Sequence, residues 1–233
     1  AGGHKPIRVI GTRDTGGYGQ ALRGLLQALA AVGYGPDVVR FVPAITTSMA
    51  VGKYDDEDAW MEPYFIGDRT EDEAINIVHL NPALVGIYHT AGRYNIAYCA
   101  WETDSLPKKE HDYHGVKRTV VDCLNDYDEI WVPSTFLVDV FKQSGVTAPI
   151  YVVPHALQES LLALPPRNPA PLKGDAQTVF YNIGSLNPRK NTQGVVRAYW
   201  SCGWQPTTDP VRMMLHQVPS NRTETAILQH QHM

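Results

Sequence analysis

The sequence predicts an α/β protein in which a mostly parallel β-sheet is flanked by helices. Three features support this fold class: short apolar runs recur along the chain, amphipathic segments separate them, and a glycine-rich turn follows the first run. Parallel strands need crossover connections, which are usually helices, so this alternation is typical of a parallel sheet covered on both faces. We therefore expect a Rossmann-like arrangement.

The first strand and helix lie near the N-terminal end. Residues 7–11 form a short apolar run, and residues 12–19 contain three glycines. The next apolar residues recur at the spacing of one helix face and are Leu22, Leu25, Leu26 and Leu29. Residues 38–42 are expected to form the second strand, and the acidic residues 53–73 a long excursion outside the sheet.

The alternation continues as far as residue 153. The predicted elements are strands over 75–80, 94–101, 129–132 and 150–153 and helices over 82–89, 116–125 and 134–144. Ser134 is the predicted N-cap of the last helix, and Gly145 its stop. Residues 1–153 thus form a first, Rossmann-like domain.

A change in composition marks the predicted domain boundary. Residues 154–177 are rich in proline and lack periodicity, which is typical of a linker. Residues 178–233 begin a second unit, with strands over 178–184 and 211–215 and a helix over 191–202. Because this unit is shorter than a typical domain, we expect a partial C-terminal domain and a truncated chain or fragment.

Composition and charge narrow the functional classes. Apolar residues make up 43% of the chain and charged residues 19%, as in ordinary globular proteins. The net charge of −4 disfavours general nucleic-acid binding. The basic pairs Lys108-Lys109 and Lys117-Arg118 are interpreted as solvated helix faces, with peripheral contact to a membrane surface as the alternative.

Cysteine and histidine usage gives no sign of a disulfide framework or a metal site. The three cysteines, Cys99, Cys123 and Cys202, form no CxxC pair, and the nine histidines lack metal-ligand spacing. No apolar run is long enough to span a bilayer, and no cleavable leader is recognisable. We therefore expect a cytoplasmic protein.

Two glycine-containing turns are candidate phosphate sites. In the first, Gly16, Gly17, Tyr18 and Gly19 precede a helix, where backbone amides and the helix dipole favour an anion. The loop does not match GxGxxG, so a nicotinamide dinucleotide is not indicated. The alternative is a strand-to-helix turn that needs glycine only for its backbone angles.

The second turn follows the first strand of the second unit. It contains Gly184, Ser185, Arg189 and Lys190. Cations are electrostatically unfavourable at the start of a helix, so this pair indicates an anionic partner such as a diphosphate. The alternative is an exposed helix start whose charges bind nothing.

Acidic and aromatic residues follow the predicted strand over 94–101. Trp101, Glu102 and Asp104 are expected at the carboxyl edge of the sheet, where open α/β sheets bind ligands. Carboxylates accept hydrogen bonds from sugar hydroxyls, and an indole face packs on a sugar ring. Alternatively, the acids cap the following segment and Trp101 is simply buried.

Two histidines lie close to the ends of predicted strands. His79 ends the sequence Ile-Asn-Ile-Val-His, and His155 follows Val153-Pro154. Either side chain could hydrogen-bond a ligand or transfer a proton. The alternative interpretation is that each histidine is structural.

Together these motifs resemble the retaining GT-B glycosyltransferases of family 4. The matching segments span most of the chain and are residues 16–19, 79–82, 94–96, 101–104, 128–134, 152–155 and 184–191. Residues 128–134 (Asp-Glu-Ile-Trp-Val-Pro-Ser) and 189–191 (Arg-Lys-Asn) are the most specific.

The resemblance implies two Rossmann-like domains, with the acceptor bound mainly by the first and a nucleotide-diphosphate sugar mainly by the second. It implies neither a metal nor a cofactor, since the nucleotide sugar is a co-substrate. In such enzymes the lysine matching Lys190 contacts the donor diphosphate, and the loop matching residues 16–19 faces the cleft. The leaving diphosphate helps to deprotonate the acceptor, so a dedicated protein base is not required.

The chain departs from the family pattern at three places. Ser185 stands where the family usually has an arginine, and Ala156 where it usually has a glycine. The acidic pair that holds the donor sugar and ribose is not recognisable. We therefore expect a truncated glycosyltransferase that is weakly active or inactive, or alternatively a non-catalytic sugar- or nucleotide-binding module.

In the glycosyltransferase interpretation, Glu102 and His79 are the candidate catalytic residues. Trp101, Asp104 and His155 are the candidate contacts to the acceptor or the sugar. The donor base, the transferred sugar and the acceptor, whether carbohydrate, lipid-linked or protein, stay open.

Overall fold

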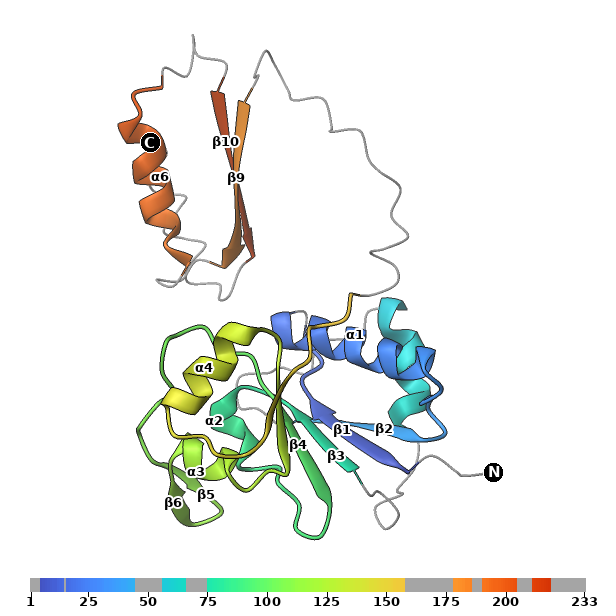
Figure 1. Ribbon diagram of the computed structural model, residues 1–233. Coiled ribbons are helices and arrows are strands. Elements are labelled where there is room, and N and C mark those ends of the chain that lie inside the picture. Colours follow the sequence, from blue (N-terminus) through green and yellow to red (C-terminus); the bar gives the residue numbers. More distant parts are fainter. Residues whose placement is uncertain are drawn as a thin grey trace. The chain divides into compact units, whose positions relative to one another are not determined.

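The computed structural model describes residues 5–14, 16–44, 56–65, 75–157, 178–185, 190–204 and 211–218. The chain divides into two compact units, Ala1–Leu164 and Pro165–Met233 (Figure 1). Most of the predicted linker, residues 158–177, lies outside the described residues. The domain limits given above therefore stay a prediction.

A six-stranded parallel sheet forms the centre of the first unit. Its strand order is β2-β1-β3-β4-β7-β8. The strands are β1 (Ile7–Gly11), β2 (Val39–Pro43), β3 (Ile75–His79), β4 (Tyr94–Tyr98), β7 (Glu129–Val132) and β8 (Ile150–Val152). All five neighbouring pairs are parallel, which confirms the predicted α/β, Rossmann-like sheet.

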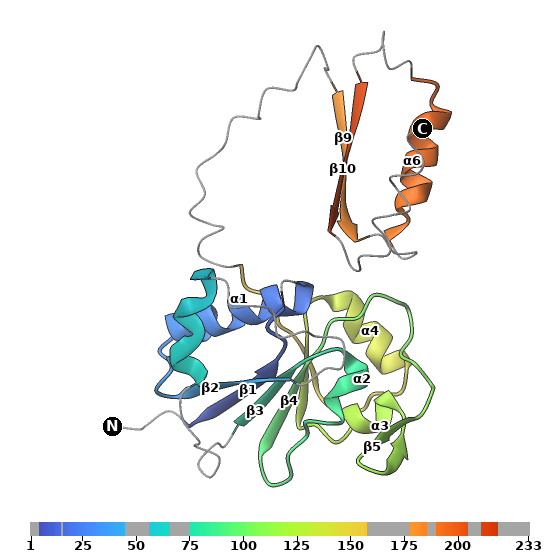
Figure 2. The ribbon, with the colours of Figure 1, turned by 180° about the vertical axis from the view of Figure 1, so that it is seen from behind.

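Helices cover both faces of this sheet. They are α1 (Gly17–Ala31), the 3₁₀ helix η1 (Asp56–Phe65), α2 (Pro82–Val85), α3 (Val120–Leu124) and α4 (Thr135–Gln143). Neighbouring strand residues such as Val9 and Ile10 belong to different hydrophobic clusters, because successive side chains point to opposite faces. Figures 1 and 2 show α1 and η1 on one side of the sheet and α2, α3 and α4 on the other.

The core under α1 includes an unexpected contribution from η1. Leu22 and Leu26 of α1 are fully buried. In η1, Met61 is fully buried and Tyr64 is almost fully buried. Residues 53–73 were predicted to lie outside the sheet as a polar excursion. Residues 56–65 do lie outside the sheet, but their apolar side chains complete this core.

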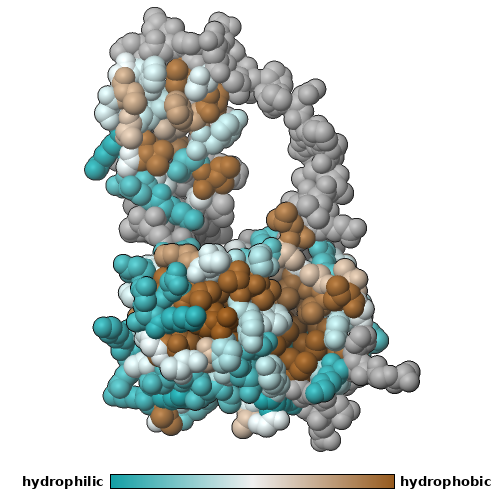
Figure 3. Space-filling view, in the orientation of Figure 1, coloured by the Kyte–Doolittle hydropathy of each residue, from teal (hydrophilic) through white to brown (hydrophobic). Residues whose placement is uncertain are grey.

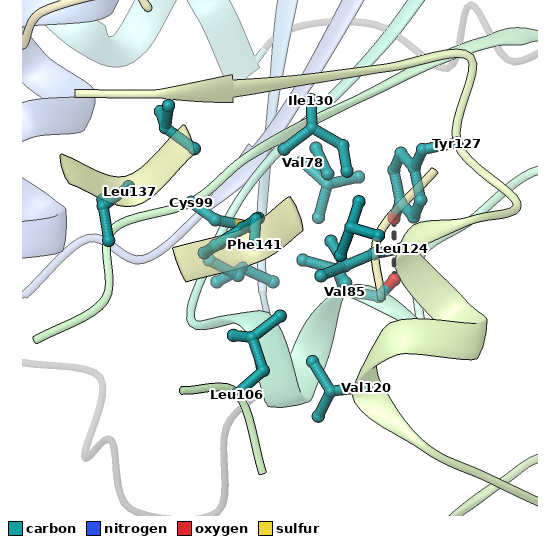
Figure 4. Close-up of a cluster of buried hydrophobic side chains, with 14 of the residues drawn as sticks. Val78, Val85, Cys99, Leu106, Val120, Leu124, Tyr127, Ile130, Leu137 and Phe141 are labelled. Atoms are coloured by element: carbon teal, nitrogen blue, oxygen red, sulfur yellow. Dashed lines mark hydrogen bonds between the residues drawn. The ribbon is translucent and has the colours of Figure 1, made fainter. Parts of the chain in front are cut away.

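The core on the other face joins α2, α3 and α4 to the sheet. Figure 4 shows Val85, Leu124, Ile130 and Phe141 converging in it. The Tyr127 hydroxyl donates a hydrogen bond to the Val85 carbonyl oxygen at 2.7 Å, so this buried phenol has a partner. Each large side chain that is fully buried here contributes about 1.5–3 kcal/mol of stabilisation.

The prediction of a helix over 116–125 is wrong in its first part. Residues His111–Tyr113 (β5) and Val116–Arg118 (β6) form an antiparallel hairpin, and α3 begins only after Thr119. Gly115 takes the left-handed conformation with φ of 85°, which favours a turn. Thr119 and Asp122 then form a capping box that fixes the start of α3.

The second unit contains a strand, a helix and a strand, as predicted. Strands β9 (Thr178–Ser185) and β10 (Val211–Val218) pair in parallel, and α6 (Thr192–Ser201) connects them. Large apolar side chains are exposed on this unit, among them Tyr181, Ile183 and Trp200.

The surface of the first unit also carries apolar side chains. Figure 3 shows apolar side chains gathered on the face of the first unit that this view presents. Phe136 of α4 is one of the exposed apolar side chains of this unit. Among the described residues, no helix combines the length and hydropathy needed to cross a membrane.

Candidate functional site

The candidate site lies at the carboxyl ends of β1, β3 and β4. The parallel register pairs Gly11 with His79 and His79 with Tyr98, so the ends of these three strands lie side by side. Ligands of open α/β sheets bind at this edge because the loops that follow the strands meet there. The predicted residues His79, Glu102 and the 16–19 loop all belong to it.

The glycine loop is folded tightly against the start of α1. The Asp14 side chain accepts a hydrogen bond from the Gly16 amide at 2.6 Å, so that amide is already occupied. Gly16 is the N-cap of α1, and a glycine has no side chain with which to cap the first turn. The amides of that turn and the helix dipole are features that favour an anion, and the phosphate site at this loop stays a prediction.

A buried arginine that sequence reasoning missed holds this loop in place. Arg23 of α1 donates hydrogen bonds to the carbonyl oxygens of Asp14 at 2.9 Å and Arg13 at 3.3 Å. Only 6% of Arg23 is exposed. The sign of this role in the sequence was a single cation within the apolar run of α1, because an arginine buried there needs hydrogen-bond acceptors.

His79 is the central polar group of the site. Its imidazole is fully buried, and Nδ1 lies 3.0 Å from the Tyr98 carbonyl oxygen. A carbonyl oxygen can only accept, so Nδ1 carries the proton and Nε2 presents a lone pair. Among the described residues, Nε2 has no hydrogen-bond partner. A buried acceptor without a partner indicates a site for a ligand donor or for water.

Three other rings surround His79. Its ring centroid lies 4.6 Å from that of Tyr98, 5.3 Å from that of Tyr18 and 5.6 Å from that of His155. The Tyr18 hydroxyl donates to the Ala100 carbonyl oxygen at 2.6 Å, and this bond ties α1 to the loop after β4. The structure thus brings together Tyr18, His79 and His155, three of the predicted residues.

The cluster is uncharged at neutral pH. Burial lowers the pKa of His79 to about 4, and the neighbouring His155 also lowers it. Burial likewise lowers the pKa of His155 and raises that of the Tyr18 hydroxyl. A histidine with so low a pKa is a weak base, so His79 suits the acceptance of a hydrogen bond better than the removal of a proton.

The two predicted acids of the loop after β4 have different neighbours. Glu102 is exposed, and its charge contributes to the raised pKa of Tyr18, so it lies near the cluster. Asp104 instead lines a cavity of about 540 Å³ together with Leu106, Thr119 and Gln143. That cavity is lined by none of the residues of the His79 cluster.

Trp101 is partly buried. Its indole N–H donates to the Ser105 carbonyl oxygen at 2.8 Å, and its ring packs against the core that contains α4. The part of the indole left exposed is what a sugar ring could contact.

The phosphate turn of the second unit is described only in part. Arg189 lies outside the described residues, and Ser185 is described only as the last residue of β9. The Lys190 chain runs beside Gly184, since a Cβ at residue 184 would lie 3.6 Å from Lys190 Cγ. Lys190 is exposed, and it is followed by Asn191, the N-cap of α6.

Thr12 is a further residue that sequence reasoning missed. It follows β1 directly, is almost fully buried, and its hydroxyl finds no partner within the described parts of the chain. A threonine after a strand gives no signal of its own in the sequence. The described residues contain no group of three or more His, Cys, Asp or Glu side chains that could hold a metal ion.

Taken together, the site offers the N-terminal end of α1, a buried acceptor at His79 and an exposed carboxylate at Glu102. Such a combination can bind a ligand that carries both a phosphate and hydroxyl groups. Comparison of the chain with models of protein families and with curated proteins finds no match.

Proposed function

We propose that this chain is a glycosyltransferase that transfers a sugar, with retention, from a nucleotide-diphosphate donor. The observation that carries the proposal is the buried lone pair on His79 Nε2 at the carboxyl edge of a parallel sheet. Because Nδ1 is committed to the Tyr98 carbonyl, Nε2 can only accept, and a sugar hydroxyl is the matching donor.

The diphosphate of the donor is assigned to Lys190, an exposed cation that stands just before α6 in the second unit. Lys190 is the residue to which the family resemblance assigns the diphosphate. A lysine there would stabilise the charge that develops as the sugar–phosphate bond breaks.

The proposed reaction needs no strong protein base. A bond forms between the acceptor oxygen and the anomeric carbon, while the bond between that carbon and the β-phosphate oxygen breaks. The acceptor proton passes to the leaving phosphate oxygen on the same face. The low pKa of His79 fits this scheme, because His79 then orients the sugar through a hydrogen bond and removes no proton.

Calorimetric titration of the chain with UDP and GDP tests the diphosphate assignment. We expect binding of one of them, weakened about tenfold by Lys190→Ala through loss of one charged hydrogen bond. Arg197→Ala is the matched control, since Arg197 is an exposed cation in α6, the helix that Lys190 precedes. Equal affinity of the Lys190 and Arg197 variants would overturn the assignment.

The same preparation separates the enzyme from the non-catalytic binding module. Incubation with labelled UDP and GDP sugars should release free sugar or a glycosylated acceptor with the anomeric configuration retained. Binding without any turnover would favour the binding module, and release of a sugar with inverted configuration would contradict the proposed mechanism.

A further inference from the structure

The Nε2 atom of His79 is buried, and this burial raises a question of access. A ligand hydroxyl must approach to within about 3 Å of a nitrogen to hydrogen-bond to it. The whole His79 side chain is shielded from solvent. Some group that covers the imidazole must therefore move before Nε2 can meet a ligand.

Three rings are in contact with the His79 ring, and two of them are tethered. The Tyr18 hydroxyl donates to the Ala100 carbonyl oxygen at 2.6 Å, and the Tyr98 hydroxyl to the Val153 carbonyl oxygen at 2.8 Å. Tyr18 also belongs to α1 and Tyr98 to β4. Moving either ring would break a hydrogen bond that is at least partly shielded from water, which is unfavourable.

The third ring, His155, is held differently. It makes edge contacts to His79 and Tyr98, with centroids 5.6 Å and 5.4 Å away. No hydrogen bond of its ring nitrogens is found among the described residues. His155 is exposed on its outer side, whereas His79 is not. Of the three rings in contact with His79, that of His155 is therefore the most exposed to solvent.

The backbone around His155 is fixed on both sides. Val153 accepts the Tyr98 hydroxyl and donates its amide to the Val132 carbonyl oxygen at 2.8 Å. On the other side, the Ala156 carbonyl oxygen occupies the space that a side chain on Gly24 of α1 would fill. The His155 side chain can therefore turn about its own bonds while the chain that carries it stays in place.

We propose that His155 is the movable cover of the His79 site. Rotation of its side chain away from His79 opens Nε2 to a sugar hydroxyl, and its return shields that hydrogen bond from water. His155 is thus a positioning residue that acts through His79. The inference deepens the proposed function, because a cover matters only when His79 meets a ligand, but its test requires no sugar.

Carbethoxylation of histidines by diethyl pyrocarbonate at neutral pH, followed by peptide mass spectrometry, measures access to His79. The reagent reacts with a neutral imidazole nitrogen, so Nε2 must be reached for reaction at His79. We expect His155→Ala to raise the initial rate at His79 about tenfold or more, because an open state populated at roughly 10% or less limits the rate in the unchanged chain. His155→Phe retains a ring over His79 and should leave the rate low.

Two controls keep the result specific. The exposed His114 serves as an internal reference, and its rate should be the same in all variants. Tyr18→Phe keeps its ring and loses only a hydroxyl, so it should leave the rate at His79 low. An unchanged rate at His79 in His155→Ala, or an equally fast rate in His155→Phe, would overturn the proposal and leave the glycosyltransferase assignment untouched.

Discussion

The carbonyl oxygen of Asp14 lies against Gly19, in the space that a side chain at residue 19 would fill. This contact folds the glycine loop onto the first turn of α1. The close approach of the Asp14 oxygen explains why residue 19 is a glycine. A side chain at residue 17 would instead face open space. The two glycines of one loop therefore respond differently to the same substitution.

We expect Gly19→Ala to displace the loop and to lower the free energy of unfolding by about 1–3 kcal/mol, as overpacking does. Gly17→Ala adds its methyl where no atom lies within 4 Å, so it should stabilise the helix by up to about 1 kcal/mol. Urea unfolding of both variants measures the difference. Similar effects of the two substitutions would refute the close approach.

Stability should fall in acid because of His79. Burial lowers its pKa to about 4 from an ordinary value of 6.5, so below pH 6.5 the unfolded chain binds a proton that the folded chain excludes. The resulting loss grows as the pH drops from 6.5 towards 4 and amounts to roughly 3 kcal/mol. His79→Asn keeps an N–H for the Tyr98 carbonyl, and its urea unfolding should depend less on pH over this range. An identical pH slope in both proteins would assign the effect to other groups.

The three cysteines should differ in reactivity. Cys99 and Cys123 are buried, and burial raises the pKa of both thiols, whereas Cys202 is exposed. Titration of the native protein with a thiol-specific disulfide reagent should therefore modify Cys202 quickly and the other two only after denaturation. Fast reaction of Cys99 in the native protein would contradict the packing of the core under α4.

Substitution of Glu102 should affect transfer to the acceptor more than hydrolysis of the donor. We expect Glu102→Gln to lower transfer to an acceptor about tenfold, the effect of one hydrogen bond to a charged group, and to leave hydrolysis of the sugar nucleotide unchanged. Glu110→Gln removes another exposed carboxylate of the same loop region and serves as the control. Equal loss of transfer and hydrolysis would place Glu102 elsewhere in the reaction.

The sequence predicted the parallel sheet well because its strands are short apolar runs separated by clear turns. Strand β1 has the predicted bounds, and β3 differs by one residue. The β5-β6 hairpin was missed because four of its six strand residues are polar or charged and its turn depends on His114 and Gly115, which stand inside a segment of mixed charge. The core role of Met61 was missed because it lies in an acidic stretch without periodicity.

The sequence predicted where along the chain the candidate site lies, but not which side chains meet there. Strand ends pointed to His79 and to the loop that carries Glu102, because parallel strands place their carboxyl ends at one edge. The contacts of His79 with Tyr98 and His155 join residues far apart in the sequence, so no local pattern could reveal them. The same limit applies to Asp104, which lies two residues from Glu102 but lines a separate cavity.

The central claim is that His79 Nε2 accepts a hydrogen bond from the sugar of a nucleotide donor. Calorimetry with UDP and UDP-glucose, and with GDP and GDP-mannose, tests it most directly. For one pair we expect the sugar nucleotide to bind about tenfold more tightly than the nucleotide alone, with this advantage lost in His79→Asn and kept in His114→Asn. A sugar advantage that survives in His79→Asn, or the absence of any advantage in the unchanged chain, would contradict the claim.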